Sequence, residues 1–368
     1  MMESMSIPFS QQTQSRRVRL RPEIERLVAY DAGPQESDGA FQLAGNENPF
    51  APLPRVLEAV RSASFSRYPD AAATRLRTAL AQRHGLPFEA VHVSAGSVSI
   101  IYELIRALAA PGDDVVMSWR SFEAYPKAVA VAGATSTFVA NTAEGAHDLD
   151  AMAAVISDST RVVLVCSPNN PTGTVVLHEE FERFMRAVPS SVVVALDEAY
   201  VEYVSDPKAV RSAELLSRYP NLIVLRTFSK AYGLAGMRVG FALGDPDLLD
   251  GLRTAALPFA VTELAQATAL ASLDSETELS DRVRAIVELR SYVIGALRLQ
   301  GWAVPAAEGN FVWLPTGDDT AEAARVFREA GMLVRSFAPD GIRITIAERE
   351  SIEPLIESAG HVRRLLRD

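Results

Sequence analysis

Residues 225–240 read Leu-Arg-Thr-Phe-Ser-Lys-Ala-Tyr-Gly-Leu-Ala-Gly-Met-Arg-Val-Gly, and they continue an apolar run that begins at Leu222. The stretch contains one lysine, Lys230, which lies among apolar and small residues. Such surroundings remove water from an amine, which lowers its pKa and frees it to act as a nucleophile. The glycines that follow, Gly233, Gly236 and Gly240, allow the backbone to bend close to this amine.

Groups that can bind an anion flank this lysine. The hydroxyls of Thr227 and Ser229 precede it, and Arg238 follows it. Hydroxyls and a guanidinium are natural donors to a phosphate. An amine that can attack an aldehyde, beside donors for a phosphate, predicts a site for pyridoxal 5′-phosphate. The alternative from this stretch alone is a surface lysine in a glycine-containing loop.

Two more polar clusters close apolar runs earlier in the chain. Ser167-Pro-Asn-Asn-Pro-Thr-Gly173 follows the run 161–166, and Asp197-Glu-Ala-Tyr200 follows the run 191–196. Each cluster alone has a simpler interpretation, because the first is also typical of a turn and Asp197 of a helix cap. Three polar clusters at successive strand ends favour one common pocket.

The order of the elements predicts an α/β fold. Near-continuous Val, Leu and Ile runs without alternation indicate strands that are buried on both faces of a mostly parallel sheet. We expect these strands at 114–118, 135–139, 161–166, 191–196, 222–226 and 238–243, with helices between many of them. The predicted domains are a disordered tail (1–15), an arm that packs with the small domain (16–45), a large cofactor-binding domain (46–260) and a small α+β domain (261–368).

A strand followed by glycine and a helix lies upstream, at Val91 to Ser97. Free backbone N–H groups and the helix dipole at such a point attract an anion. The alternative is an ordinary strand–helix turn with a serine cap.

Near the other end of the chain, Arg343 lies between Ile342 and Ile344 and therefore faces away from both on a short strand. A solvent-facing arginine at a sheet edge is the alternative there.

Composition excludes several classes of function. The net charge of −10 argues against a nucleic-acid surface. The single Cys166 excludes an internal disulfide and a cysteine metal cage, and five scattered histidines argue against a histidine metal site. No apolar run approaches the roughly 20 residues that span a bilayer. The polar start also lacks the apolar core of a signal peptide, so we expect no membrane association and a cytoplasmic protein.

The motifs resemble a known family when they are taken together. NENP (46–49), RYPD (67–70), SPNNPTG (167–173), DEAY (197–200) and TFSKAYGLAGMRVG (227–240) resemble the fold-type-I pyridoxal-phosphate aminotransferases over roughly residues 18 to 365. Within them the chain is similar to the histidinol-phosphate aminotransferase subfamily. GSVS (96–99), WRSFEAYP (119–126), LPFAV (257–261) and NFVWLP (310–315) look like the actinobacterial aromatic amino-acid (phenylalanine) aminotransferases.

The resemblance implies roles for individual residues. Lys230 would bind the cofactor aldehyde, and Asp197 would pair with the protonated pyridine nitrogen, so that the ring accepts electrons. The other cofactor contacts that it implies are Asn170 and Tyr200 to the ring's 3′-oxygen, Phe122 over the ring, and Thr227, Ser229, Arg238 and the N–H groups of Gly96, Ser97 and Val98 to the phosphate.

The same resemblance implies a homodimer and a substrate cavity. Tyr68 would reach the phosphate of the neighbouring subunit's cofactor, and Arg343 would receive the substrate carboxylate. Tyr30 and Arg335 would line the substrate cavity. For an apolar wall the chain offers Phe259, Val98, Tyr30 and Trp119.

The predicted reaction is a ping-pong transamination between an aromatic L-amino acid, phenylalanine or tyrosine, and 2-oxoglutarate. The freed lysine would act as general base and acid. Histidinol phosphate is the alternative substrate, but Val98-Ser99 replaces an acidic pair that is common in the family, which weakens that alternative. Ala51 also replaces a usual glycine. A decarboxylase on the same scaffold is a further alternative, and a pyridoxal-sensing regulator would need a DNA-binding domain for which residues 1–40 are too short.

Overall fold

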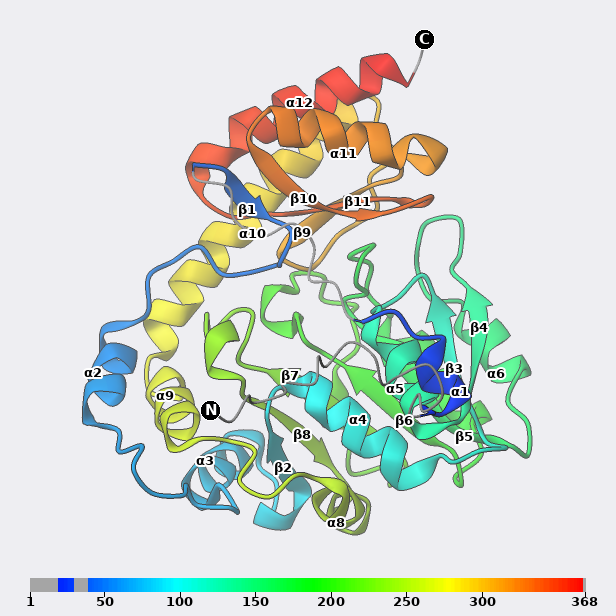
Figure 1. Cartoon of the computed structure of the whole chain (residues 1–368), viewed down its shortest axis with the longest axis vertical. Helices are drawn as coiled ribbons and strands as arrows, with labels where there is room; N and C mark the ends of the chain where they lie inside the picture. The colour runs from blue at the N-terminus through cyan, green and yellow to red at the C-terminus, as the bar shows by residue number, and fades with distance from the viewer. Residues whose placement is uncertain (1–18, 30–38, 367–368) are drawn as a thin grey trace, which may run out of the picture.

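The computed structural model describes residues 19–29 and 39–366 (Figure 1). The predicted tail of residues 1–15 and the predicted site residue Tyr30 lie outside these ranges, as does part of the predicted arm. The described chain is built around a seven-stranded sheet and a four-stranded sheet. The larger sheet carries helices on both faces, and the smaller sheet lies above it in Figure 1.

The larger sheet has the strand order β2-β8-β7-β6-β5-β3-β4. Its strands are β2 (Val91–Ser94), β3 (Asp114–Trp119), β4 (Thr135–Ala140), β5 (Thr160–Cys166), β6 (Val193–Asp197), β7 (Leu222–Thr227) and β8 (Gly240–Gly244). The pairs from β4 through β3, β5 and β6 to β7 are parallel, whereas β8 is antiparallel to both of its neighbours. The predicted mostly parallel sheet with a smaller α+β part is confirmed.

Helices bury both faces of this sheet. On one face α4 (Ser97–Leu108), α5 (Ala124–Ala132) and α8 (Pro246–Ala255) form a core with the inward side chains of β3, β5 and β6. On the other face α6 (Leu149–Ala154) and α7 (His178–Ala187) contribute apolar side chains such as Phe181 and Phe184. Burial on two faces explains why β3, β5, β6 and β7 are nearly continuous apolar runs. The expectation of a fully buried strand at 135–139 is wrong, because β4 is an edge strand with Phe138 51% exposed.

The smaller sheet has the order β1-β10-β11-β9. Its strands are β1 (Phe41–Leu43), β9 (Phe311–Leu314), β10 (Met332–Phe337) and β11 (Gly341–Thr345). The helices α11 (Thr320–Glu329) and α12 (Ile352–Leu365) lie over it, and α10 (Glu276–Leu299) runs from this sheet down to α9 (Glu263–Leu273) (Figure 1). In turn α9 packs against α2 (Pro54–Ser62) and α3 (Thr74–His84).

The described residues of the arm contact two parts of the molecule, the smaller sheet and a helix of the larger part. Strand β1 pairs in parallel with β10, so the segment before the NENP motif joins the smaller sheet. The short helix α1 (Pro22–Glu25) instead packs against α5, where Arg21 donates a hydrogen bond to the carbonyl of Val131. The predicted domain boundaries stay a prediction.

One strand begins later than the sequence predicts. The run 238–243 indicated a strand from Arg238, but β8 begins at Gly240. Arg238 instead has a left-handed backbone (φ 55°) after a short 3₁₀ turn at 235–237, and its Nη1 donates to the carbonyl of Ala235 at 2.9 Å. Arg238 therefore belongs to the turn before β8 and does not pair with a neighbouring strand. In the part of the chain that the structure describes, further 3₁₀ turns lie at 88–90, 201–203, 212–214, 317–319 and 349–351.

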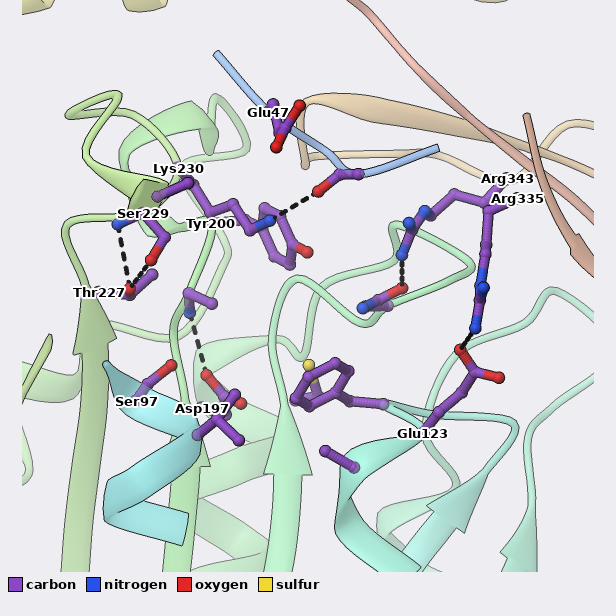
Figure 2. A pocket seen from close by; sticks show the side chains of 18 of the residues that line it. Glu47, Ser97, Glu123, Asp197, Tyr200, Thr227, Ser229, Lys230, Arg335 and Arg343 are labelled. Atoms are coloured by element: carbon purple, nitrogen blue, oxygen red, sulfur yellow. Dashed lines mark hydrogen bonds and ion pairs between the residues drawn. The ribbon is translucent and has the colours of Figure 1, made fainter. Parts of the chain in front are cut away.

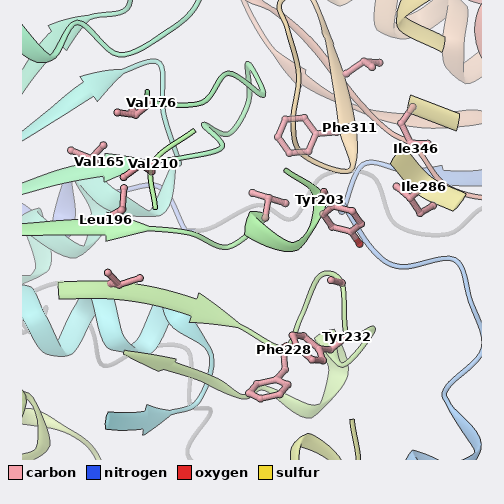
Figure 3. Packing of buried hydrophobic residues seen from close by; sticks show 14 of the residues in the cluster. Val165, Val176, Leu196, Tyr203, Val210, Phe228, Tyr232, Ile286, Phe311 and Ile346 are labelled. Carbon is pink, nitrogen blue, oxygen red and sulfur yellow. The ribbon is translucent and has the colours of Figure 1, made fainter. Parts of the chain in front are cut away.

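A continuous apolar core joins the two sheets. Phe311 and Ile346 from the smaller part lie near Tyr203, while Leu196 and Val165 lie deeper in the larger sheet (Figure 3). This shared core fixes the smaller sheet over the ends of the larger one.

Within the described ranges, no helix combines the length and the apolar character that crossing a membrane requires. The same residues contain no group of three His, Cys, Asp or Glu side chains that could hold a metal ion.

Candidate active site

A pocket of about 630 Å³ lies between the carboxyl ends of the large-sheet strands and the smaller sheet. Residues from both ends of the chain line it, because Ala44 and Gly45 follow β1 while Arg335 and Arg343 lie on β10 and β11. Its volume is within the range of sites for small ligands. The three polar clusters that the sequence placed at strand ends meet in this pocket, in Asn170, Asp197 and Lys230 among others.

Lys230 projects into the pocket from the loop after β7 (Figure 2). Its Nζ donates a hydrogen bond to the carbonyl of Gly45 at 3.0 Å. Burial lowers the pKa of Lys230 to about 7, and the positive charge of Arg343 adds to the effect, while Glu47 opposes it. A large fraction of the amine is therefore neutral and nucleophilic near pH 7.

A group of donors lies beside this lysine. The Thr227 hydroxyl donates to Ser229 Oγ at 2.9 Å, and Arg238 Nη1 donates to the same oxygen at 3.4 Å. Helix α4 begins next to them at Ser97, with its unpaired N–H groups at the pocket. Together they form a cradle for an anion at the carboxyl end of β7.

Two glycines make this cradle possible. Gly96 has φ 85°, and a Cβ there would lie 2.7 Å from Arg238 Nη2. A Cβ on Gly240 would lie 2.5 Å from the backbone nitrogen of Ser97. Backbone therefore approaches backbone where a phosphate would bind, which is the geometry that glycine permits.

Asp197 lies at the end of β6 and is 4% exposed. Tyr125 Oη donates to its Oδ2 at 2.8 Å, and the backbone nitrogen of Ala199 donates to its Oδ1 at 3.2 Å. Burial raises the pKa of Asp197 to about 6, although these hydrogen bonds oppose the rise. Because a cation beside it would stabilise the carboxylate, this position suits a protonated ring nitrogen.

Arg343 points into the pocket and is 7% exposed, so the alternative of a solvent-facing arginine is wrong. Its Nη1 donates to Asn170 Oδ1 at 2.6 Å, and its Nη2 donates to the carbonyl of Ala44. Tyr200 lies nearby, where its hydroxyl accepts a hydrogen bond from Asn46 Nδ2 at 3.0 Å. A buried guanidinium that neutral oxygens hold in place can receive a carboxylate.

The predicted apolar wall is only partly correct. Val98 and Phe122 line the pocket, and Phe122 packs edge-on against Tyr125. Trp119 does not line it and packs against Phe138 instead, with ring centroids 5.0 Å apart. The wall therefore comes from the strand–helix turns and not from the end of β3.

The aromatic pair Phe259 and Tyr68 lies outside this pocket. The two rings stack with centroids 4.7 Å apart, and Tyr68 is 84% exposed. Phe259 was expected in the wall, but its left-handed backbone (φ 58°) presents it to Tyr68. Within one chain, Tyr68 contributes nothing to the cradle.

Several residues that shape the site were not predicted from the sequence. Tyr125, which donates a hydrogen bond to Asp197, lies three residues after Phe122. Both belong to one motif, from which only Phe122 was predicted to contact the cofactor. Glu47 belongs to the quoted NENP motif, but the motif does not show which of its side chains faces the lysine. Glu123 was also missed, because a glutamate at a helix start is commonly an exposed cap.

The sequence profile of the family Aminotransferase class I and II matches residues 39–358 of the chain. The chain is a class I/II aminotransferase. The resemblance seen in its motifs is confirmed, and so are the predicted enzyme class and pyridoxal 5′-phosphate as the cofactor.

Known proteins resemble this aminotransferase over nearly its whole length. The aromatic amino acid aminotransferase of Streptomyces avermitilis is 47% identical over 95% of this chain and 98% of its own length. The protein of the same name from Thermobifida fusca is 48% identical over 89% of this chain and 92% of its own. Among solved structures, the histidinol-phosphate aminotransferase of Sinorhizobium meliloti in complex with pyridoxal 5′-phosphate superposes with a TM-score of 0.85, at 27% identity, over 96% of this chain and 100% of that one.

The residues of this aminotransferase fit the cofactor. The cradle at Ser97, Ser229 and Arg238 has the donors and the glycine-lined backbone that a phosphate needs. Asp197 is a buried carboxylate that an adjacent cation would stabilise, and Lys230 is an amine with a depressed pKa in the same pocket. These residues would hold the phosphate, the ring nitrogen and the aldehyde respectively.

Replacing Asp197 with asparagine tests the assignment of the ring nitrogen. Asp197→Asn keeps the shape of the side chain but cannot keep the nitrogen protonated. Loss of one strong charge-assisted contact in the transition state costs about 3–4 kcal/mol, so we expect kcat to fall roughly 10²–10³-fold. The measurement is kcat with phenylalanine beside a circular dichroism spectrum. The exposed Asp150→Asn should change neither, and an Asp197→Asn enzyme within a few-fold of wild type would contradict the assignment.

Proposed function

We propose that this aminotransferase transfers the amino group of an aromatic L-amino acid, phenylalanine or tyrosine, to 2-oxoglutarate, giving an aryl-pyruvate and glutamate. The observation that carries the proposal is the similarity to relatives named aromatic amino acid aminotransferase, at 47% identity over 95% of this chain. The pocket supports it, because the apolar side chains of Val98 and Phe122 line the same cavity as the buried Arg343.

Arg343 is proposed to bind the α-carboxylate that every substrate of the reaction carries. Its guanidinium is already oriented by Asn170 and by the Ala44 carbonyl, so little side-chain freedom is lost on binding. A carboxylate in this position leaves the Cα of the amino acid on the side of the pocket that Lys230 occupies. Both half-reactions use the same guanidinium.

Lys230 is proposed to move the proton. With the amine neutral near pH 7, Nζ can take the proton from the substrate Cα, and the resulting ammonium can return it on the way to product. When it is bound, pyridoxal 5′-phosphate supplies the electron sink for this step. Asp197, which Tyr125 holds in position by a hydrogen bond, would stabilise a protonated ring nitrogen of that cofactor.

Histidinol phosphate is the second candidate substrate. The observation in its favour is the presence of two arginines, Arg335 and Arg343, in one pocket, where they could bind a phosphate. Solved structures named histidinol-phosphate aminotransferase also share the fold. We rank it second because Val98 adds an apolar surface where an imidazole would need polar partners.

We also propose a homodimer that completes the site with Tyr68. The exposed side chains of Tyr68, Phe65, Leu257 and Phe259 are large and apolar, and such side chains are costly to leave in water. A second subunit that covers them would bring the Tyr68 hydroxyl to the neighbouring cradle. The exposure of Tyr68 in a single subunit would then be explained by its contact with the second subunit.

The substrate class is tested by steady-state comparison of phenylalanine and histidinol phosphate, each with 2-oxoglutarate as acceptor. We expect a higher kcat/KM for phenylalanine, because the Val98 and Phe122 surfaces favour an aromatic ring. Arg343→Leu should reduce kcat/KM for phenylalanine and for glutamate alike, since both lose the same carboxylate partner. A tenfold or greater preference for histidinol phosphate would establish the second candidate, and release of CO₂ in place of a keto acid would establish a decarboxylase.

The dimer is tested with Tyr68→Phe, which keeps the ring and removes the hydroxyl. We expect weaker retention of pyridoxal 5′-phosphate on dialysis and an unchanged ratio of kcat/KM between phenylalanine and glutamate. Tyr292→Phe is the matched control, because Tyr292 is also exposed and binds Glu353 on α12. A monomer that is fully active at nanomolar concentration would contradict the proposal.

A further inference from the structure

Two arginines lie side by side in the pocket. Arg335 on β10 and Arg343 on β11 are direct partners across an antiparallel ladder. Directly opposite residues of such a pair point to the same face of the sheet, with Cβ atoms about 4.5–5.5 Å apart. Both side chains line the pocket, and Figure 2 shows them starting close together on the smaller sheet, with Arg335 reaching to Glu123.

The two guanidiniums have different partners. Arg343 donates hydrogen bonds to two neutral oxygens, those of Asn170 and Ala44. Arg335 forms an ion pair, in which its Nη2 lies 2.8 Å from Glu123 Oε2. The side chains of this pair are 12% and 29% exposed, so it is partly shielded from water and still open to a ligand.

Glu123 comes from the opposite wall of the pocket. It directly follows Phe122 and precedes the first turn of α5, so the carboxylate is anchored beside an aromatic side chain of the wall. The pair thus joins the larger part of the molecule to β10 across the pocket. The Glu123 carboxylate therefore already pairs with Arg335 before any ligand binds.

We propose that Glu123 is a specificity-determining residue for the transamination proposed above, on which this inference rests. It neutralises Arg335 while an aromatic substrate is bound, so that a substrate with one carboxylate need not supply a partner for Arg335. A ligand with a second anionic group must displace Glu123 from Arg335 to bind there. The Glu123 carboxylate then lies close to the anionic group of the ligand, and the two negative charges repel each other. Glu123 therefore lowers the affinity for dicarboxylates relative to aromatic monocarboxylates.

The geometry makes this a bias and not an exclusion. A partly exposed ion pair is weak enough to open, so 2-oxoglutarate can still compete for Arg335. An apolar ring leaves the pair intact and loses nothing, whereas a distal carboxylate exchanges one partner of Arg335 for another. Discrimination by an unfavourable charge beside the wrong ligand is a general route to specificity.

The experiment uses the enzyme loaded with pyridoxal 5′-phosphate and two unreactive ligands. Glutarate carries two carboxylates, and 3-phenylpropionate carries one carboxylate and an aromatic ring. Their dissociation constants are measured by calorimetric titration of the wild type and of Glu123→Gln, Arg335→Gln and the double variant. Asp340→Asn is the matched control, because Asp340 pairs with Arg120 between the same two parts of the molecule but neither residue lines the pocket.

Glu123→Gln should bind glutarate at least tenfold more tightly and 3-phenylpropionate within twofold of wild type. Arg335→Gln should weaken glutarate alone, and adding Glu123→Gln to it should change nothing further, because the two residues act as one unit. Asp340→Asn should leave the ratio of the two dissociation constants unchanged.

An unchanged ratio in Glu123→Gln, or equal weakening of both ligands, would overturn the inference and leave Glu123 as a tie between the two parts. Turnover of phenylalanine by the wild type is recorded beside these titrations. If the wild type does not turn over phenylalanine, the proposed function fails. If it does and the ratio stays fixed, only the role of Glu123 fails.

Discussion

The shielding of Lys230 from bulk water inside the pocket is the constraint on which the rest of the structure depends. Burial is the main cause of its depressed pKa, and the charge of Arg343 adds to it. Both effects arise in a pocket to which the two parts of the fold each contribute residues. The larger sheet carries the lysine at its strand ends, and the smaller sheet brings the arginine over it. An exposed lysine in the same loop would stay protonated at neutral pH.

The closure of the pocket rests on contacts between distant parts of the sequence. The Thr345 hydroxyl donates to the carbonyl of Leu43 at 2.8 Å, and the backbone nitrogen of Asn46 donates to the same hydroxyl at 3.0 Å. Asn310 Nδ2 donates to the carbonyl of Asn46 at 3.2 Å. These bonds are buried, where leaving a partner unsatisfied is costly. They hold Gly45, which accepts the hydrogen bond of the lysine, in place.

The sequence predicted the parts of the site whose position follows from local rules. Polar residues after buried parallel strands must meet at one edge of the sheet, which placed Asn170, Asp197 and Lys230 together. Contacts that depend on how two parts of the fold meet were not predictable, and the ion pair of Glu123 with Arg335 is one of them. Trp119 was assigned to the wall from its residue type, but the direction of its side chain depends on its packing against Phe138.

Chemical labelling of the lysines tests the low pKa of Lys230 most directly. The chain has three lysines, Lys127, Lys208 and Lys230, so each can be followed by peptide mass spectrometry. In cofactor-free protein treated with an acetylating reagent over a pH series, Lys230 should reach half of its maximal rate near pH 7, whereas an ordinary lysine does so near pH 10.4. Prior addition of pyridoxal 5′-phosphate should protect Lys230 alone. Titration of Lys230 near pH 10.4, or protection of Lys127 in its place, would contradict the proposed chemistry of the pocket.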